Sequence, residues 1–200
     1  MRYLLIIFIF LLMIPPHVSA ELIRKVEKDN KSKTILFLSD GEEIARETVA
    51  PGKQKTVSGE ILDGIYKEYS KNGTIKYEWL YKSGHLDGVS RELYDGRRPK
   101  YEWSYKNGTL DGPSRYYSSF GHVVRERMYL LGAQDGLTRE YYLNGKLKTE
   151  TMYHENEKDG LQIEYYKNGK VKYEKTYKDD DLVSTKLFDE EGEPITILNL

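Results

Sequence analysis

The dipeptide Asp-Gly recurs through this chain at a fixed interval of 24 residues. Its five copies are Asp63-Gly64, Asp87-Gly88, Asp111-Gly112, Asp135-Gly136 and Asp159-Gly160. A constant period of this length is typical of repeat proteins, in which each unit covers part of the surface of the next. The sequence therefore predicts a row of similar units in place of a single globular core.

Other residue types keep the same period and show how each unit is built. One column consists of Glu78, Glu102, Glu126, Glu150 and Glu174. Another consists of Tyr81, Tyr105, Tyr129, Tyr153 and Tyr177. Together the five units predict a repeat array over residues 63–182.

Each unit has the pattern of a β-hairpin. In the first unit, two strand-like segments, 65–69 and 75–81, flank the turn 71–73 with its Asn-Gly pair. Asn-Gly between such segments is a strong hairpin signal, because the glycine adopts the positive φ that the turn requires. We therefore predict an all-β fold, an elongated antiparallel sheet of successive β-hairpins. The glycines expected to shape its turns are Gly64, Gly73, Gly88, Gly96, Gly112, Gly121, Gly136, Gly145, Gly160 and Gly169.

Two registers are possible within a hairpin. A two-residue loop places Lys67 opposite Glu78, whereas a three-residue loop places Tyr69 opposite Ile75 and Glu68 opposite Lys76. The second register forms apolar and opposite-charge pairs, each contributing roughly 0.2–1 kcal/mol, and is the preferred prediction. In this register the glutamate column faces hydrogen-bond donors and has a structural role. These expected partners are Tyr66, Ser90, Ser114, Thr138 and Gln162.

Residues 1–20 have the pattern of a secretory signal peptide. Arg2 supplies a positive charge, residues 4–14 form an uninterrupted apolar run, and cleavage is expected after Ala20. As a helix this run would span about 16 Å, roughly half of a bilayer's hydrocarbon core. We therefore expect an exported protein, periplasmic or secreted, with no transmembrane segment after cleavage. An uncleaved anchor is the alternative.

The segments that flank the array keep only traces of the period. Residues 21–62 contain a strand-like stretch, 34–38, followed by Asp40-Gly41, and residues 183–200 begin with Val183-Ser184 in place of Asp-Gly. A terminal repeat lacks a neighbour on one side, so arrays commonly end in atypical units. We predict an N-terminal strand or cap with a degenerate first repeat over 21–62, and a degenerate C-terminal cap over 183–200.

The repeating unit, D-G-x-x-x-x-[YL]-x-x-[ND]-G followed by E-x-x-Y-x-x-G, resembles the bacterial variant of the MORN repeat. In the second unit the matching residues are Asp87, Gly88, Gly96, Glu102, Tyr105 and Gly108. The resemblance implies an elongated sheet of hairpins that acts as an interaction module. Some bacterial relatives are labelled antitoxins or immunity proteins, so the resemblance also implies neutralisation of a toxin as an alternative.

Composition argues against several classes of function. The chain has no cysteine, which excludes disulfide scaffolds, thiolate metal sites and cysteine nucleophiles. Its net charge of −1 lacks the cationic excess that nucleic-acid binding requires. His85, His122 and His154 occupy different places in the repeat and share no metal-ligand spacing. No catalytic motif is present. We therefore expect a protein that is not an enzyme, with no cofactor, no metal and no nucleic-acid partner.

Aromatic and basic residues are the feature that indicates a function. Trp79 and Trp103 share one column, Arg91 and Arg115 share another, and the preferred register places both columns on one face. Tyrosine, tryptophan and arginine are enriched at protein-binding hot spots. The candidate binding strip consists of Tyr69, Tyr77, Trp79, Tyr81, Arg91, Tyr101, Trp103, Tyr105, Arg115, Tyr117, Tyr129 and Arg139.

The candidate strip is consistent with several uses. We prefer a protein-interaction or scaffold module whose partner is another protein. Toxin neutralisation and binding of cell-envelope glycan or lipid remain alternatives. The same side chains could instead be buried between repeats, with cationic stems packed over aromatic rings.

Overall fold

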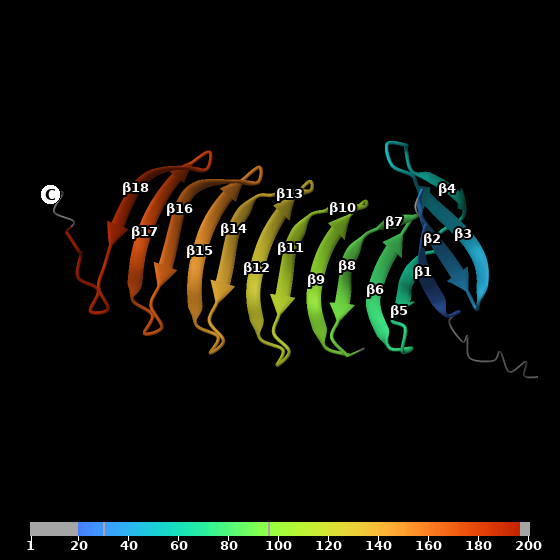
Figure 1. The fold of residues 1–200 in the computed structure, drawn as a ribbon, viewed down its shortest axis with the longest axis horizontal. Helices are drawn as coiled ribbons and strands as arrows, with labels where there is room; N and C mark the ends of the chain where they lie inside the picture. Colours follow the sequence, from blue (N-terminus) through green and yellow to red (C-terminus); the bar gives the residue numbers. More distant parts are fainter. Residues whose placement is uncertain (1–19, 30, 96, 197–200) are drawn as a thin grey trace, which may run out of the picture.

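The computed structural model describes residues 20–29, 31–95 and 97–196. These residues form one open sheet of 18 strands, so the prediction of an all-β sheet of hairpins is confirmed. The repeat strands follow one another along the sheet in chain order (Figure 1). Ala20 is exposed, whereas the rest of the predicted signal peptide and Gly96 lie outside the described residues. No helix within these ranges has the length and apolar character needed to cross a bilayer.

The strands divide into an N-terminal group and the repeat array. The N-terminal strands are β1 (Leu22–Lys28), β2 (Lys33–Ser39), β3 (Glu42–Val49) and β4 (Thr56–Gly59). The array consists of β5 (Gly64–Tyr69), β6 (Ile75–Lys82), β7 (His85–Leu86), β8 (Gly88–Leu93), β9 (Pro99–Lys106), β10 (Thr109–Leu110), β11 (Gly112–Tyr117), β12 (Val123–Leu130), β13 (Ala133–Gln134), β14 (Gly136–Tyr141), β15 (Leu147–His154), β16 (Glu157–Tyr165), β17 (Val171–Lys178) and β18 (Asp181–Leu187). Neighbouring repeat strands are antiparallel, whereas β1 joins β5 in parallel, with Ile23 opposite Lys67.

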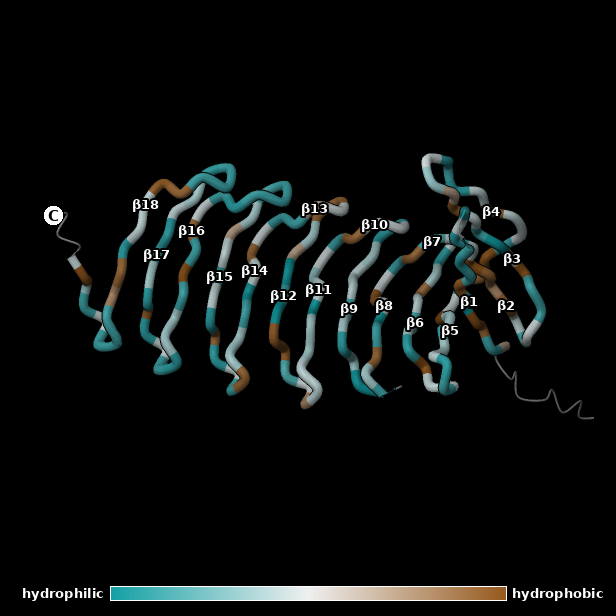
Figure 2. The backbone as a smooth tube through the Cα atoms, viewed as in Figure 1, coloured by the Kyte–Doolittle hydropathy of each residue, from teal (hydrophilic) through white to brown (hydrophobic). Residues whose placement is uncertain are grey.

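The N-terminal strands pack against the first repeat and form the main hydrophobic core with it. Phe37 is fully buried, and its ring meets the rings of Tyr66 and Tyr81 edge-on at centroid distances of 5.3 and 5.2 Å. Ile35, Ala45 and Ile61 complete this cluster. Figure 2 shows hydrophobic residues along β2 and mainly hydrophilic residues in the turns that join β15, β16, β17 and β18. The core therefore lies at one end of the molecule, and the array extends away from it.

The hairpin register is partly as predicted. Tyr69 lies opposite Ile75, as the preferred register predicts, but Glu68 lies opposite Tyr77 and not Lys76. The reason is a β-bulge after each turn, which inserts one extra residue into the second strand. The inserted residues are Lys76, Lys100, Val124, Lys148 and Lys172.

The bulge changes the partners of the glutamate column. The predicted partners were wrong by one residue: Arg91 lies opposite Glu102 and Ser90 opposite Trp103. Lys67 likewise faces Glu78, and Tyr66 faces Trp79. Directly paired residues project to the same side of a sheet, and consecutive residues project to opposite sides. The aromatic and basic columns therefore lie on opposite faces, which corrects the prediction of a shared face.

Asp-Gly pairs connect one repeat to the next, as the second pair shows. The carboxylate of Asp87 accepts a hydrogen bond of 3.1 Å from the backbone N–H of Asn107, in the following unit's turn. Gly88 has a φ of +100°, and a Cβ there would lie 2.6 Å from Leu80 Cδ2. Both members of the pair thus have a structural reason to recur. The other described turn glycines of the predicted set also have positive φ.

Candidate functional site

One face of the sheet carries a row of stacked aromatic rings, which we call the aromatic row. Its members, in order, are Tyr77, Trp79, Trp103, Tyr101 and Tyr116. Successive ring centroids are 5.3, 6.0, 5.5 and 4.8 Å apart, with interplanar angles between 6° and 29°. The side of the sheet that bears the row is called the aromatic face below.

The N-terminal strands hold the first part of this row in place. Arg24 of β1 is 8% exposed, and its guanidinium lies 4.8 Å from the centroid of the Trp79 ring. Its Nη1 is 2.6 Å from Glu68 Oε2, and the same oxygen accepts a 3.3 Å hydrogen bond from the Trp79 indole N–H. Trp79 is thus fixed by a cation–π contact and a hydrogen bond, which makes it a rigid starting point for the row.

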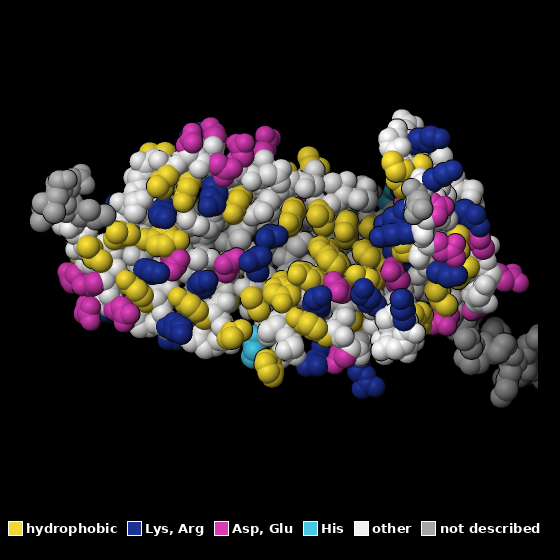
Figure 3. All heavy atoms as spheres, viewed as in Figure 1, with side chains coloured by type: hydrophobic (Ala, Val, Ile, Leu, Met, Phe, Trp, Pro, Cys, Tyr) yellow, Lys and Arg dark blue, Asp and Glu magenta, His cyan; other side chains and the backbone are white. Residues whose placement is uncertain are grey.

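A groove lies at the other end of the aromatic row, where β9, β11 and β12 are adjacent. Its lining includes Tyr101, Trp103, Ser114, Tyr116 and Arg127. The Ser114 hydroxyl is buried and has no hydrogen-bond partner among the described residues. In the space-filling view, apolar side chains gather over the middle strands beside the N-terminal group (Figure 3). This end of the row is therefore open to a ligand.

The opposite side of the sheet, the ionic face, carries the glutamate column. Three of its members lie opposite arginines: Arg91 Nε is 2.8 Å from Glu102, Arg115 Nε is 2.6 Å from Glu126, and Arg139 Nε is 2.8 Å from Glu150. Arg139 Nη1 also lies 3.8 Å from Glu126 of the preceding repeat. The ladder therefore connects successive units, although half-exposed pairs of this kind stabilise a protein only weakly when taken singly.

Tyrosine hydroxyls complete this ladder. Tyr117 donates a 2.6 Å hydrogen bond to Glu102 Oε2, and Tyr165 donates one of 3.2 Å to Glu150. Although burial alone raises the pKa of Glu102, the bonds from Tyr117 and Arg91 bring that pKa below its usual value. Burial, together with the bond to Glu102, raises the pKa of Tyr117 to about 12.

This shift predicts a loss of stability at alkaline pH. A tyrosine with a pKa of about 10 in the unfolded chain and about 12 in the fold keeps its proton longer when folded. Its stabilising contribution is therefore complete below pH of about 10 and is lost as the pH rises towards about 12. Urea unfolding over this range should show the decline, and Tyr117→Phe should make it shallower. An equal decline in the variant would contradict this assignment.

The structure separates the predicted binding strip into two groups. Tyr77, Trp79, Tyr81, Tyr101, Trp103, Tyr105 and Tyr129 belong to the aromatic face. Tyr69, Arg91, Arg115, Tyr117 and Arg139 belong to the ionic face. Tyr81 is 6% exposed and forms part of the core, so it is not available to a ligand.

Sequence reasoning missed several residues of the groove, among them Tyr116, Arg125 and Arg127. Tyr116 breaks a column, because it stands where the other four repeats have glutamate. Arg127 stands in the column of Trp79 and Trp103. A search for departures from the repeat, in addition to its regularities, could have found them.

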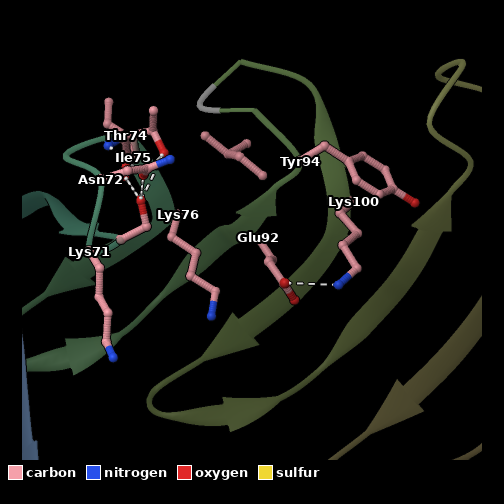
Figure 4. A pocket seen from close by; sticks show the side chains of 10 residues that line it. Lys71, Asn72, Thr74, Ile75, Lys76, Glu92, Tyr94 and Lys100 are labelled. Atoms are coloured by element: carbon pink, nitrogen blue, oxygen red, sulfur yellow. Dashed lines mark hydrogen bonds and ion pairs between the residues drawn. The ribbon is translucent and has the colours of Figure 1, made fainter.

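A second hollow lies at the turn edge of the sheet (Figure 4). It is lined by Lys71, Asn72, Lys76, Glu92 and Lys100, among others. Lys100 Nζ is 3.0 Å from Glu92, and Figure 4 draws no interaction between that pair and either Lys71 or Lys76. The polar groups of this hollow therefore do not converge on a common point, and we assign no site to it.

Comparison with known proteins identifies the repeat. The sequence model of the MORN repeat variant matches residues 62–83, 134–156 and 158–179. No curated protein matches the chain. The matched segments contain the hairpins β5–β6 and β14–β15 and nearly all of the hairpin β16–β17. The units between them keep the same 24-residue columns and the same bulged pairing. The chain therefore contains repeats of the MORN repeat variant, within a longer array of similar hairpins.

Proposed function

We propose that the protein is a non-catalytic, exported repeat module that binds a protein partner through the aromatic face. The observation that carries this proposal is the aromatic row, whose members are half-buried on the face against which the N-terminal strands pack at the first repeat. Packing within the array does not require such rings, since the fourth repeat has Thr149 and Thr151 in the positions of Tyr101 and Trp103.

The arrangement of the rings favours a protein over a glycan as the ligand. Sugars bind aromatic residues by stacking on a free ring face. Here Trp103 is stacked with both Trp79 and Tyr101, at interplanar angles of 6° and 9°, so its ring already has aromatic neighbours. The ring edges and the adjoining groove present an apolar surface with arginines beside it. Buried aromatic and arginine side chains are the usual anchors of protein interfaces.

The test is site-specific crosslinking in intact cells. A photoreactive phenylalanine at Tyr116, beside the groove, should form a discrete adduct with one partner. The same group at Phe120, which is 84% exposed in a turn, should not form it and serves as the control. Trp103→Ala should lower the yield of the adduct by about tenfold or more, because loss of a central anchor commonly costs 2 kcal/mol or more.

Two results would contradict binding through this face. The first is an identical set of adducts from the two positions. The second is an adduct that survives Trp103→Ala at full yield in a variant that still melts cooperatively. If the captured partner proves to be a toxin, the immunity function implied by the resemblance is the form that this protein binding takes.

Export is the second part of the proposal, and the surroundings of Glu21 support it. Its backbone N–H donates a 2.9 Å hydrogen bond to Asp40 Oδ1, and its carboxylate accepts one of 2.6 Å from Tyr69. Cleavage after Ala20 would convert that N–H into an ammonium group beside a carboxylate, which the fold accommodates. N-terminal sequencing of the chain from the cell envelope should begin at Glu21. A chain found only in the cytosol with residues 1–20 attached would contradict export.

A further inference from the structure

The third repeat differs from the other four on the aromatic face. Tyr116 replaces a column that is otherwise Glu68, Glu92, Glu140 and Glu164. Arg125 replaces a column with Tyr77, Tyr101, Thr149 and Tyr173, and Arg127 replaces one with Trp79, Trp103, Thr151 and Lys175. The last two columns also vary in the fourth repeat, but only the third repeat combines an aromatic ring with two arginines at these positions. All three changed residues line the groove at the end of the aromatic row.

The groove combines apolar walls with a cation that has no acidic partner. Tyr116 stacks on Tyr101 at 4.8 Å, and Arg125 Nε is 2.6 Å from Glu140. Arg127 forms no ion pair with any residue in the described ranges. The buried Ser114 hydroxyl lies opposite Arg127 on the neighbouring strand and is also without a partner there.

The charge of the whole aromatic face follows the same pattern. Four glutamates on this face form ion pairs. The pairs are Glu68–Arg24 at 2.6 Å, Glu92–Lys100 at 3.0 Å, Glu140–Arg125 at 2.6 Å and Glu164–Lys172 at 2.8 Å. The cations on this face that form no ion pair within the described part of the chain are Lys76, Arg127, Lys148, Lys158 and Lys175. The chain as a whole has a net charge of −1, so its excess acid lies elsewhere, as in the runs 179–181 and 189–191.

We infer that the aromatic face receives an acidic segment of the partner protein, with a carboxylate at Arg127 and an apolar side chain against Trp103 and Tyr116. This inference rests on the proposed function and specifies its partner. Unpaired cations beside an apolar groove complement a segment that alternates acidic and apolar residues. Nucleic acid fits less well, because bases stack on open ring faces, and here the rings stack on one another.

The experiment measures binding of fluorescein-labelled peptides to the full chain as recovered from cells. The probe is a short peptide that alternates glutamate with leucine. Two control peptides replace glutamate with glutamine or leucine with serine, and a short thymidine oligonucleotide supplies negative charge without apolar side chains. The glutamate–leucine peptide should bind at least about tenfold more tightly than the two control peptides and the oligonucleotide. Added salt should lower its affinity.

Matched charge reversals locate the site. Arg127→Glu should lower the affinity for the glutamate–leucine peptide by about tenfold or more, because it places a like charge against the carboxylate. Arg97→Glu, an exposed arginine in a turn, is the control and should leave binding unchanged. Equal binding by the Arg127 variant, or an oligonucleotide that binds as tightly as the peptide, would overturn the inference. If the peptide fails while the Tyr116 adduct still depends on Trp103, the partner chemistry is wrong and binding through this face stands.

Discussion

Replacing Phe37 with alanine should lower the free energy of unfolding by about 3–5 kcal/mol, the usual cost of removing a fully buried phenylalanine ring. The ring is 0% exposed and lies edge-on to both Tyr66 and Tyr81. Its removal would leave a cavity between the N-terminal strands and the first repeat and would weaken the packing between them. Because Arg24 of these strands holds Trp79, the variant should also loosen the start of the aromatic row. Urea unfolding monitored by tryptophan fluorescence measures both effects.

The chain provides a matched control for this substitution. Phe120 is 84% exposed in a turn, and Phe120→Ala should change the free energy of unfolding by no more than about 0.5 kcal/mol. Comparable losses in the two variants would show that the core does not lie where the structure places it.

A second large effect is expected at Gly59, where β4 ends and the chain passes to the repeats. Gly59 has a φ of +79°, and a Cβ there would lie 2.2 Å from the backbone oxygen of Ile44. Alanine would therefore add a clash with rigid backbone to the strain of a left-handed conformation. We expect Gly59→Ala to cost about 1–2 kcal/mol for the conformation and a further 1–3 kcal/mol, roughly, for the clash.

Gly73→Ala separates these two contributions. Gly73 has nearly the same φ, +80°, but no atom lies within 4 Å of its added Cβ. Its substitution should cost only the conformational part, about 1–2 kcal/mol. Thermal or urea unfolding of both variants should show the larger loss at Gly59. If Gly73→Ala proved as damaging, close backbone contact at β4 would not be what constrains Gly59.

The array could be predicted from the sequence because its information is local and repeated. The Asp-Gly period and the Asn-Gly turns indicate hairpins, and the pairing of Tyr69 with Ile75 follows from the turn. The bulge one residue later could not be predicted in this way. Its position holds lysine in four repeats and Val124 in the third, so side-chain type does not mark it. The backbone hydrogen bonds after the turn decide it, and they reverse which columns share a face.

The N-terminal core and the groove were not predicted from the sequence, for different reasons. The contact of Phe37 with Tyr66 and Tyr81 joins segments far apart in the chain, and no local pattern specifies such a contact. The groove residues were visible as breaks in the columns, but a search for regularity passes over them. In a repeat protein the columns report how the units stack, whereas their exceptions indicate where one unit has acquired a role of its own.

The central claim is that the sheet separates an aromatic face from an ionic face, and it depends on the register of the hairpins. Ser114 lies directly opposite Arg127, so their Cα atoms should be about 4.5–5.5 Å apart, within the range for a disulfide. The chain has no cysteine of its own, which makes the test unambiguous. Mass spectrometry without reduction should show a disulfide in the double variant Ser114→Cys, Arg127→Cys and none in Ser114→Cys, Glu126→Cys. A disulfide in the second variant and not in the first would mean that the aromatic face does not exist.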